Sequence, residues 1–287
     1  MISDSLFRDH TVFSFEIFPP KRNASIDTVY HTLDGLQGLH PDFISVTYGA
    51  AGSGNNSATV EIASVIHNQY GIESVAHLPC RYLSRAQAAD TVKQLQENGT
   101  QNILALRGDT VSDQNPQGDF VHASDLIAFL KQFKHLHIIA ACYPETHPEA
   151  PDMDTDIRHL KEKTNAGATH LISQLFLDNS CFYSFLKKVR AAGITVPIEA
   201  GIMPVINKKQ IQHMVSLCGA SLPEKFRTMM DRYGDNPDAM RDAGIAYAVD
   251  QIVDLVSHGV DGIHLYTMNN PFVARRICKA TETLFKK

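Results

Sequence analysis

FSFEIFPPK, residues 13–21, is the stretch of this sequence that decides the expected fold. Apolar residues surround a single carboxylate, Glu16, and two prolines then prevent a helix or sheet from continuing. The pattern predicts a buried strand that carries one acid to its carboxyl end. Burial disfavours the charged form of a carboxyl group and raises its pKa, which a proton donor near neutral pH needs. The alternative is a structural Glu16 that pairs with Lys21 or Arg22.

The composition is that of an ordinary globular protein. The 287 residues are 44% hydrophobic and 20% charged, and the formal net charge is -5. An acidic balance without a block of lysine or arginine argues against nucleic acid as a partner. The five cysteines are odd in number and widely spaced, with no CxxC pair, which is typical of a reduced cytosolic protein. No apolar targeting segment or membrane-length run occurs, so we expect a soluble cytoplasmic protein without a membrane partner.

Seven further apolar segments follow the first, and amphipathic helical patterns alternate with them. The segments cover residues 42–49, 73–80, 102–109, 137–144, 169–176, 197–204 and 260–267. Eight strands alternating with helices, without a linker, predict a single (β/α)8 TIM barrel, one domain over residues 1–287. Two extra helices are expected at 218–258, between strands seven and eight. A doubly wound open sheet is the alternative, but eight repeated units favour closure.

Three helix starts carry sequence signals. Ser84 is followed three residues later by Gln87, and Ser221 by Glu224, which predicts a capping box at each position. Pro271 stands at the favoured first position of the last helix. These signals place the helix boundaries more firmly than periodicity alone.

Polar residues gather at the expected carboxyl ends of the strands. In a (β/α)8 barrel these ends form one rim, and the active sites of such barrels lie there. We therefore expect a ligand pocket at this rim. Its polar members are Glu16, Thr47, Tyr48, His77, Arg107, Asp109, Tyr143, Glu145, His147, Gln174, Tyr266 and Thr267.

Several common site types do not occur in the sequence. No glycine-rich Rossmann or P-loop fingerprint follows a strand, and no lysine ends a core strand as a Schiff-base aldolase would require. His135 and His137 have a metal-like spacing, but they lie at the start of strand five, on the face opposite the rim. We therefore expect no metal site.

Nine motifs give the chain a family resemblance. The motifs are, in chain order, FSFEIFPPK, SVTYGAAGS, AHLPC, LALRGD, HASDL, YPETHPEA, SQLFLD, GIMPV and YTMN. Together they resemble 5,10-methylenetetrahydrofolate reductase of the bacterial type, from about Phe13 to Cys278. That family is a flavin-containing (β/α)8 barrel without a conventional dinucleotide-binding fold, which agrees with the missing glycine fingerprint.

The resemblance implies reduction of 5,10-methylenetetrahydrofolate to 5-methyltetrahydrofolate, which supplies methyl groups for methionine synthesis. It implies FAD as the hydride carrier, NADH or NADPH as the donor, ping-pong kinetics and a homo-oligomer. By motif position, Glu16 would be the general acid that protonates the folate N10. Asp109 would contact the pterin and influence the flavin. Gln174 would orient folate and nicotinamide, and Gln210 would help to hold the folate.

The resemblance also implies a set of FAD contacts. Flavin phosphates need cationic or N–H partners, which Arg107, His147 and Lys163 can provide. The full set is Thr47, Tyr48, Ala50, His77, Arg107, Gly108, Asp109, His122, Tyr143, His147, Ala150, Asp156 and Lys163.

Four positions depart from the family pattern. Asn270 stands where the family has an arginine after the last motif, which leaves the anchoring of the folate tail open. His159 and Glu162 replace an asparagine and an arginine in the cofactor-contacting helix, and Met214 replaces an aromatic residue beside the folate. Two other functions stay open at this point. One is a folate-dependent methyl-transferring barrel without flavin, and the other is a non-catalytic subunit that binds folate or a partner reductase.

Overall fold

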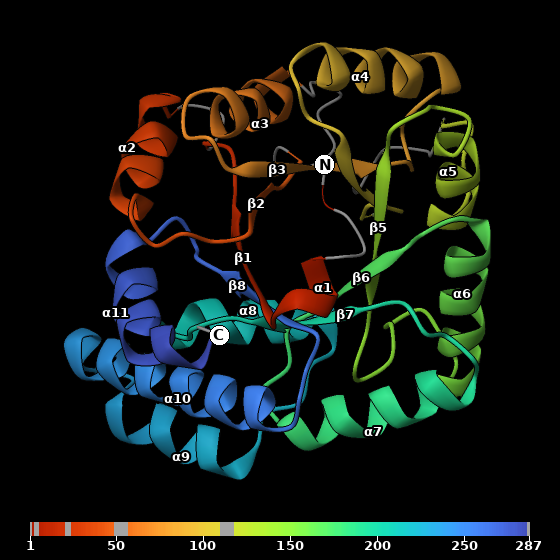
Figure 1. The fold of residues 1–287 in the computed structure, drawn as a ribbon. Helices are drawn as coiled ribbons and strands as arrows, with labels where there is room; N and C mark the ends of the chain where they lie inside the picture. Colours follow the sequence, from red (N-terminus) through yellow and green to blue (C-terminus); the bar gives the residue numbers. More distant parts are fainter. Residues whose placement is uncertain (1, 3–5, 21–23, 49–56, 110–117, 286–287) are drawn as a thin grey trace.

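The computed structural model describes residues 2, 6–20, 24–48, 57–109 and 118–285. Eight parallel strands form a closed barrel in which each strand pairs with the next along the chain and β8 pairs with β1. Figure 1 looks along the barrel and shows the helices in a ring around the strands. The expected TIM barrel is confirmed. Its strands are β1 (Val12–Ile17), β2 (Phe43–Val46), β3 (Glu73–Pro79), β4 (Asn102–Leu106), β5 (His137–Cys142), β6 (His170–Ser173), β7 (Ile198–Ile202) and β8 (Gly262–Tyr266).

Helices surround the barrel (Figure 1). Along the chain, three helices follow β7 before β8 begins, so the two extra helices expected there are present. Pro271 occupies the predicted first position of the last α-helix. Within the described residues, no helix has both the length and the apolar character needed to cross a membrane. The helices are α1 (Leu6–Asp9), α2 (Asp27–Leu36), α3 (Ser57–Asn68), α4 (Arg85–Glu97), α5 (Ala123–Leu130), α6 (Met153–Ala166), α7 (Asn179–Ala191), α8 (Lys208–Cys218), α9 (Glu224–Tyr233), α10 (Pro237–Ser257), α11 (Pro271–Thr281) and a 3-10 turn (Glu282–Leu284).

The two predicted capping boxes have different outcomes. The one at Ser84 is present at the start of α4, whereas the one at Ser221 is wrong. Helix α9 begins only at Glu224, and the N–H of Ser221 donates instead to Oε2 of Glu145 at 3.0 Å. Leu222 precedes a proline, and a residue in that position disfavours helical backbone, so the helix begins later than the pattern suggested.

Several strands that carry predicted site residues end earlier than expected, β4 and β6 by three residues each. β4 ends at Leu106 and β6 at Ser173, where the sequence pattern extended to 109 and 176. Gly108 has a φ of 87°, a left-handed conformation that turns the chain out of the sheet. Asp109 and Gln174 therefore lie in the loops that follow the strands, at the rim of the barrel.

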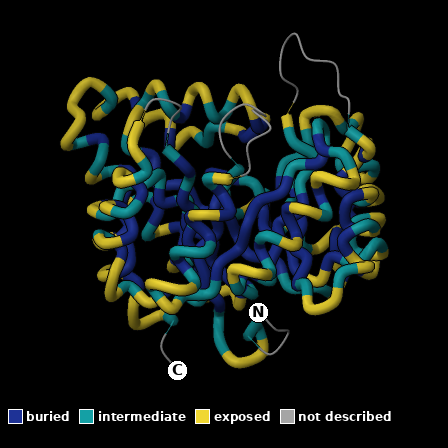
Figure 2. The backbone as a smooth tube through the Cα atoms, turned by 90° about the horizontal axis from the view of Figure 1, so that it is seen from above, coloured by how far each residue is buried: buried dark blue, intermediate teal, exposed yellow. Residues whose placement is uncertain are grey.

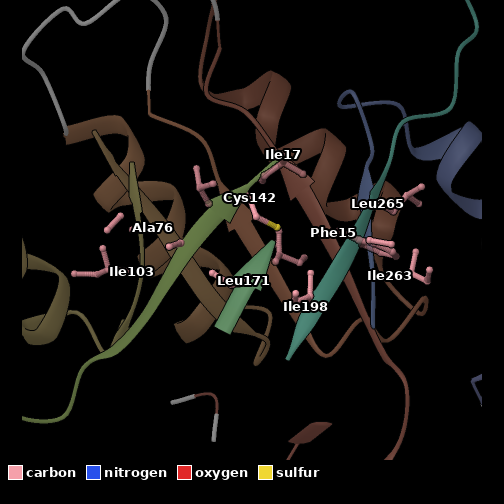
Figure 3. Close-up of a cluster of buried hydrophobic side chains, with 14 of the residues drawn as sticks. Phe15, Ile17, Ala76, Ile103, Cys142, Leu171, Ile198, Ile263 and Leu265 are labelled. Carbon is pink, nitrogen blue, oxygen red and sulfur yellow. The ribbon is translucent and has the colours of Figure 1, made fainter. Parts of the chain in front are cut away.

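The main core lies between the barrel and the surrounding helices. Outward-facing strand residues such as Phe15, Ile103 and Leu171 are completely buried there (Figure 3). Figure 2 shows the same arrangement, with buried strands at the centre and exposed residues on the outer faces of the helices. Burying one such side chain contributes about 1.5–3 kcal/mol, so this layer is a major source of stability.

A smaller apolar cluster fills the interior of the barrel and includes Val12 and Phe43. The short helix α1 lies across the N-terminal end of the barrel, where Phe7 packs against this cluster (Figure 1). Successive residues of a strand face opposite sides, so Ser14 and Glu16 of β1 face the interior. Strand β1 thus places Glu16 inside the barrel at its carboxyl end.

Candidate active site

Glu16 stands at the carboxyl end of β1 with two histidines beside it. Its Oε2 lies 3.5 Å from Nε2 of His77 on β3 and 3.6 Å from Nε2 of His264 on β8. The side chain of Glu16 is 18% exposed, whereas both histidines are buried. Glu16 is therefore accessible from solvent on one side and enclosed by ring nitrogens on the other.

His77 is neutral near pH 7. Burial lowers its pKa to about 4, with the carboxylate of Glu16 opposing the shift and His264 adding to it. Its Nε2 is buried and has no hydrogen-bond partner among the described residues. A neutral imidazole does not fix a neighbouring carboxyl group in its charged form as a cation would. The arrangement suits a carboxyl group that takes up and gives away a proton.

The backbone around Glu16 is held by the loop after β8. The hydroxyl of Thr267 donates to the carbonyl oxygen of Glu16 at 2.6 Å. The side chain of Asn269 bonds both the N–H and the C=O of Phe18, at 3.0 and 2.8 Å. These hydrogen bonds fix the end of β1, and with it the position of the acid.

Tyr266 closes the rim at β8. Its hydroxyl donates to the carbonyl oxygen of Ser173 at 2.7 Å, and burial raises the pKa of Tyr266 well above its usual value. Gly201 leaves room for this contact, because a Cβ at that position would lie 2.3 Å from the Ser173 oxygen and 2.8 Å from the Tyr266 hydroxyl. The hydroxyl therefore stays protonated and bound to β6.

A second group of predicted residues is joined by hydrogen bonds at the ends of β4 and β5. The guanidinium of Arg107 donates to both carboxylate oxygens of Glu149, at 2.5 and 2.6 Å, and this pairing raises the pKa of Arg107. The N–H of Glu149 donates to Nδ1 of His147 at 3.0 Å, and the N–H of His147 donates to Asp156 at 2.8 Å. These four residues, the Arg107 network, connect β4 with α6.

Lys163 and Tyr143 accompany this network. Nζ of Lys163 donates to the carbonyl oxygen of Ala141 at 2.9 Å, and burial lowers the pKa of Lys163. The rings of Tyr143 and His147 lie 4.6 Å apart at an interplanar angle of 66°. Burial, with the charge of Asp109 adding to it, raises the pKa of Tyr143 to about 12. The network therefore has a buried amine beside it, together with a phenol that keeps its proton at neutral pH.

The other predicted residues that follow strands make fewer contacts. Asp109 is exposed, and its negative charge acts on Arg107 and Tyr143. Gln174 accepts the N–H of Leu175 through its own Oε1 at 2.8 Å. The remaining positions in these loops are Thr47, Tyr48, Gly108 and Ala150.

Two predicted residues stand apart from both groups. Gln210 lies in the first turn of α8, and His122 is exposed immediately before α5. Among the described residues, no hydrogen bond or ion pair joins either of them directly to Glu16 or to Arg107, although the thiol of Cys80 meets the carbonyl oxygens of both Arg107 and His122, at 3.7 and 3.5 Å. Outside the described residues lie Ala50, which was predicted as a cofactor contact, and Lys21 and Arg22, the alternative partners of Glu16.

The positions that depart from the family pattern have structural roles or face solvent. Asn270 caps α11 by accepting the N–H of Val273 at 3.2 Å. His159 and Glu162 are exposed on α6. Met214 is partly buried against the apolar cluster that α8, α9 and α10 share with the end of β7. They leave the Glu16 group unchanged.

Sequence reasoning missed two members of the site, His264 and Glu149. His264 lies two residues before Tyr266 and therefore faces the same side of β8, so the period-two alternation could have found it. Glu149 pairs with Arg107 across 42 residues of sequence, and no local pattern indicates that contact. The site combines a carboxyl group between two histidines with basic side chains of the kind that suit an anionic ligand.

The family model for methylenetetrahydrofolate reductase matches residues 1–282. A 5,10-methylenetetrahydrofolate reductase of Pectobacterium carotovorum subsp. carotovorum is 36% identical over 265 residues, which are 92% of this chain and 88% of that protein. The protein of the same name from Escherichia coli K12 is 34% identical over 265 residues, which again are 92% of this chain and 88% of that protein. Methylenetetrahydrofolate reductase (NADH) 1 of Arabidopsis thaliana is 34% identical over 90% of this chain and 46% of its own length.

Solved structures share the fold at much lower identity. An uncharacterized protein of Clostridium thermocellum that binds two copies of 5-methyl-5,6,7,8-tetrahydrofolic acid matches with a TM-score of 0.66. The match covers 99% of both chains at 14% identity. A likeness at this identity shows the barrel fold alone.

Proposed function

The chain belongs to the methylenetetrahydrofolate reductase family, and from this premise we propose that it reduces 5,10-methylenetetrahydrofolate to 5-methyltetrahydrofolate with NADH or NADPH as donor. The observation that carries the proposal is the position of Glu16, a carboxyl group at the rim beside the neutral ring of His77. A methylene bridge between two nitrogens accepts a hydride readily only after N10 has left the carbon. A positioned acid makes N10 leave by protonating it.

The residues at the ends of β4 and β5 fit FAD as the cofactor. A diphosphate needs cationic and N–H partners, and Arg107 and Lys163 supply two cations. Arg107 would hold a phosphate by giving up its pairing with Glu149, and the ring of Tyr143 offers a flat surface to an aromatic ligand. Nε2 of His77 adds a buried nitrogen that no described residue satisfies. The other predicted FAD contacts keep that proposed role.

FAD, when bound, supplies the hydride carrier between NAD(P)H and the folate. The residues of the chain supply position and protons. Glu16 gives its proton to N10 and is left as a carboxylate. Asp109 accepts N–H groups of the pterin ring, and the amide of Gln174 orients the folate and the nicotinamide in turn. Because both substrates use one position, the kinetics are ping-pong, and Gln210 helps to hold the folate.

We also propose the setting in which the enzyme works. Its product supplies methyl groups for methionine synthesis, and the enzyme acts in the cytoplasm as a homo-oligomer. Four of the five cysteines are buried and all are unpaired, which supports a reducing compartment. The names of two plant relatives, from Arabidopsis thaliana and Oryza sativa subsp. japonica, specify NADH, which supports NADH as one donor.

The proposal is tested by anaerobic stopped-flow spectroscopy of the purified protein with FAD. NADH or NADPH should abolish the absorbance of the oxidised flavin, and methylenetetrahydrofolate should restore it. A protein that takes up FAD but shows no return of absorbance on addition of the folate is not this reductase. A protein that fails to take up FAD overturns the cofactor assignment. Methyl transfer from 5-methyltetrahydrofolate without FAD would favour the methyl-transferring alternative.

A further inference from the structure

A line of polar side chains runs through the interior of the barrel next to Glu16. His170, Glu199, Ser14 and His264 come from four different strands, and each is 0% exposed. Buried polar groups are costly unless they satisfy one another, so such a line requires an explanation. We call Glu199, Ser14, His264 and Glu16 the interior chain, and His170 lies at its inner end.

Each member of the interior chain lies next to the following one in space. The hydroxyl of Ser14 lies 2.5 Å from Oε2 of Glu199 and 2.6 Å from Nδ1 of His264. Nε2 of His264 faces Oε2 of Glu16 at 3.6 Å and Ser45 at 3.3 Å. The contact to Glu16 is longer than a hydrogen bond, and catalytic hydrogen bonds often shorten only when substrate binds. A path with one gap, the 3.6 Å contact between His264 and Glu16, therefore leads from a buried carboxyl group to the proposed proton donor.

The donors and acceptors of the interior chain allow two arrangements with the same number of protons. In the first, Glu199 is protonated and donates to Ser14, Ser14 donates to Nδ1 of His264, and Nε2–H faces an ionised Glu16. In the second, Ser14 donates to an ionised Glu199, Nδ1–H donates to Ser14, and the lone pair of Nε2 faces a protonated Glu16. The two arrangements differ in which carboxyl group holds the proton and in the tautomer of His264 that accompanies it.

We propose that Glu199 is a proton reserve for Glu16, connected to it through Ser14 and His264. This inference rests on the proposed role of Glu16. After Glu16 has given its proton to the substrate, the proton of Glu199 moves to Ser14, the proton of Ser14 moves to Nδ1, and the proton on Nε2 moves to Glu16. Glu199 is left ionised, His264 changes tautomer and stays neutral, and no electrons are transferred. Glu199 regains its proton by the reverse transfers after Glu16, the member of the chain that is exposed to solvent, takes up a proton from water. Glu199 does not touch the substrate and acts only through its neighbours.

The surroundings of Glu199 favour a proton at this position. Burial raises the pKa of Glu199 to about 8, although His264 and the hydrogen bond from Ser14 oppose the shift. Repulsion from Asp42 and Asp261 adds to it. An uncompensated charge is expensive inside a protein, so Glu199 keeps its proton near pH 7.

The remaining neighbour of Glu199 does not offset a charge. Nε2 of His170 lies 2.7 Å from Oε1 of Glu199, but neither atom makes a hydrogen bond of good geometry among the described residues. Burial lowers the pKa of His170 to about 3, so its ring is neutral. Among the described residues, the titratable groups near His264 are Glu16 and Glu199 at the two ends of the chain, Tyr266, whose ring lies 5.4 Å away, and the buried rings of His77 and His170. His264 is therefore the group whose tautomer reports the position of the proton.

The test is NMR of the unliganded protein with labelled histidine, which distinguishes the two neutral tautomers by the shifts of the ring nitrogens. The signal of His264 is assigned by its loss in His264→Gln. We expect His264 to change from the Nε2–H to the Nδ1–H tautomer as the pH rises through about 8, because Glu199 then becomes ionised. A single tautomer across this range overturns the proposal.

Two variants separate a proton reserve from a structural role. Glu199→Gln keeps the shape but cannot ionise, so the tautomer of His264 should no longer change with pH. Ser14→Ala leaves Glu199 able to ionise but removes the link, and the tautomer change should again disappear. Retention of the change in either variant contradicts the proposal. Ser14→Ala also serves as the test if Glu199→Gln fails to fold.

Kinetics give a second measurement. In Glu199→Gln a first turnover that starts from protonated Glu16 should proceed at the wild-type rate, because it uses only the proton of Glu16, while steady-state turnover falls about tenfold or more. A steady-state rate of Glu199→Gln that equals its first-turnover rate contradicts the proposed proton reserve. If the wild-type protein reduces no methylenetetrahydrofolate, the proposed function fails, and the NMR result still decides whether the proton moves along the interior chain.

Discussion

The carboxylate of Glu16 and Nε2 of His77 lie 3.5 Å apart, and the histidine is the more deeply buried partner, with its side chain 7% exposed against 18%. Burial lowers the pKa of His77 to about 4, so the two residues do not form a salt bridge at neutral pH. A cation at this position would favour the charged form of a neighbouring carboxyl group, and a neutral ring does not. The proposed role of Glu16 depends on this relationship.

Glu16→Gln is expected to separate the two half-reactions. The amide is nearly isosteric, so the packing of β1 should survive, but it has no proton to donate. The half-reaction with NAD(P)H needs no protonation of the folate and should keep its rate. The half-reaction with methylenetetrahydrofolate should slow by about 10²–10⁴-fold, the loss typical of a general acid. Stopped-flow absorbance measures both.

The matched control is Glu97→Gln, the same change at a carboxylate on the surface of α4, whose side chain is 62% exposed. This variant should keep both rates. A structural Glu16 would give a different pattern, with a lower thermal midpoint and similar modest losses in both half-reactions. A Glu16→Gln variant that reduces the folate at the wild-type rate would show that the proton comes from elsewhere.

Asp109→Asn tests the second proposed catalytic residue. Asp109 is exposed in the loop after β4, so the variant should fold normally and keep its thermal midpoint. If the carboxylate holds the pterin, the half-reaction with the folate should slow more than the half-reaction with NAD(P)H. Equal slowing of both would assign Asp109 to the cofactor alone.

The pairing of Arg107 with Glu149 predicts opposite effects of two substitutions on FAD. Arg107→Ala removes a cation that would meet a phosphate, and charged hydrogen bonds contribute about 1.5–3 kcal/mol, so FAD affinity should fall roughly 10-fold to 100-fold. Glu149→Ala removes the group that competes for Arg107, so FAD affinity should rise. Fluorescence titration of the apoprotein measures both dissociation constants.

Stability provides the control for this pair. The side chain of Glu149 is 57% exposed, and exposed salt bridges contribute only about 0–1 kcal/mol, so neither substitution should shift the midpoint of unfolding much. If both variants lose FAD affinity together, the network acts as a structural unit, and Arg107 is not a separate phosphate contact.

The fold could be predicted from the sequence because its signals are local. Eight apolar segments of strand length, each with its helix, require only nearest-neighbour pairing to close a barrel. The errors are also local in origin. The pattern did not show that Gly108 turns the chain out of the sheet, or that the proline after Leu222 delays α9. Both are effects of backbone conformation that hydrophobic periodicity does not report.

The candidate site was only partly predictable. Strand ends identified Glu16 and His77, because all strand ends of a parallel barrel meet at one rim. The sequence pattern did not indicate the interior chain, because Glu199 is a single polar residue within an apolar strand. Only barrel closure brings Glu199 against Ser14, 185 residues earlier. Contacts across the barrel depend on stagger between strands, and no spacing in the sequence encodes that stagger.

Glu199 also predicts how the stability of the protein depends on pH. Burial raises the pKa of Glu199 to about 8 in the folded chain, from 4.5. Between these values the unfolded chain has lost this proton and the folded chain retains it. The contribution of Glu199 to the free energy of unfolding is therefore fully present below 4.5 and is lost as the pH rises through about 8. The loss amounts to at most about 1.4 kcal/mol per pH unit.

Glu199→Gln should abolish this part of the pH dependence, because an amide does not titrate. Urea unfolding of the wild-type protein and the variant at several pH values measures the difference between their free energies of unfolding. That difference should move steadily in favour of the variant from pH 5 to pH 8 and then level off. Above the folded pKa, Glu199 is ionised in both the folded and the unfolded wild-type chain, so the pH no longer changes its contribution. Glu97→Gln, the same change on the surface of α4, should give no such trend. A difference that is constant with pH would mean that Glu199 is ionised in the folded protein throughout, and the interior chain would then hold no proton to return to Glu16.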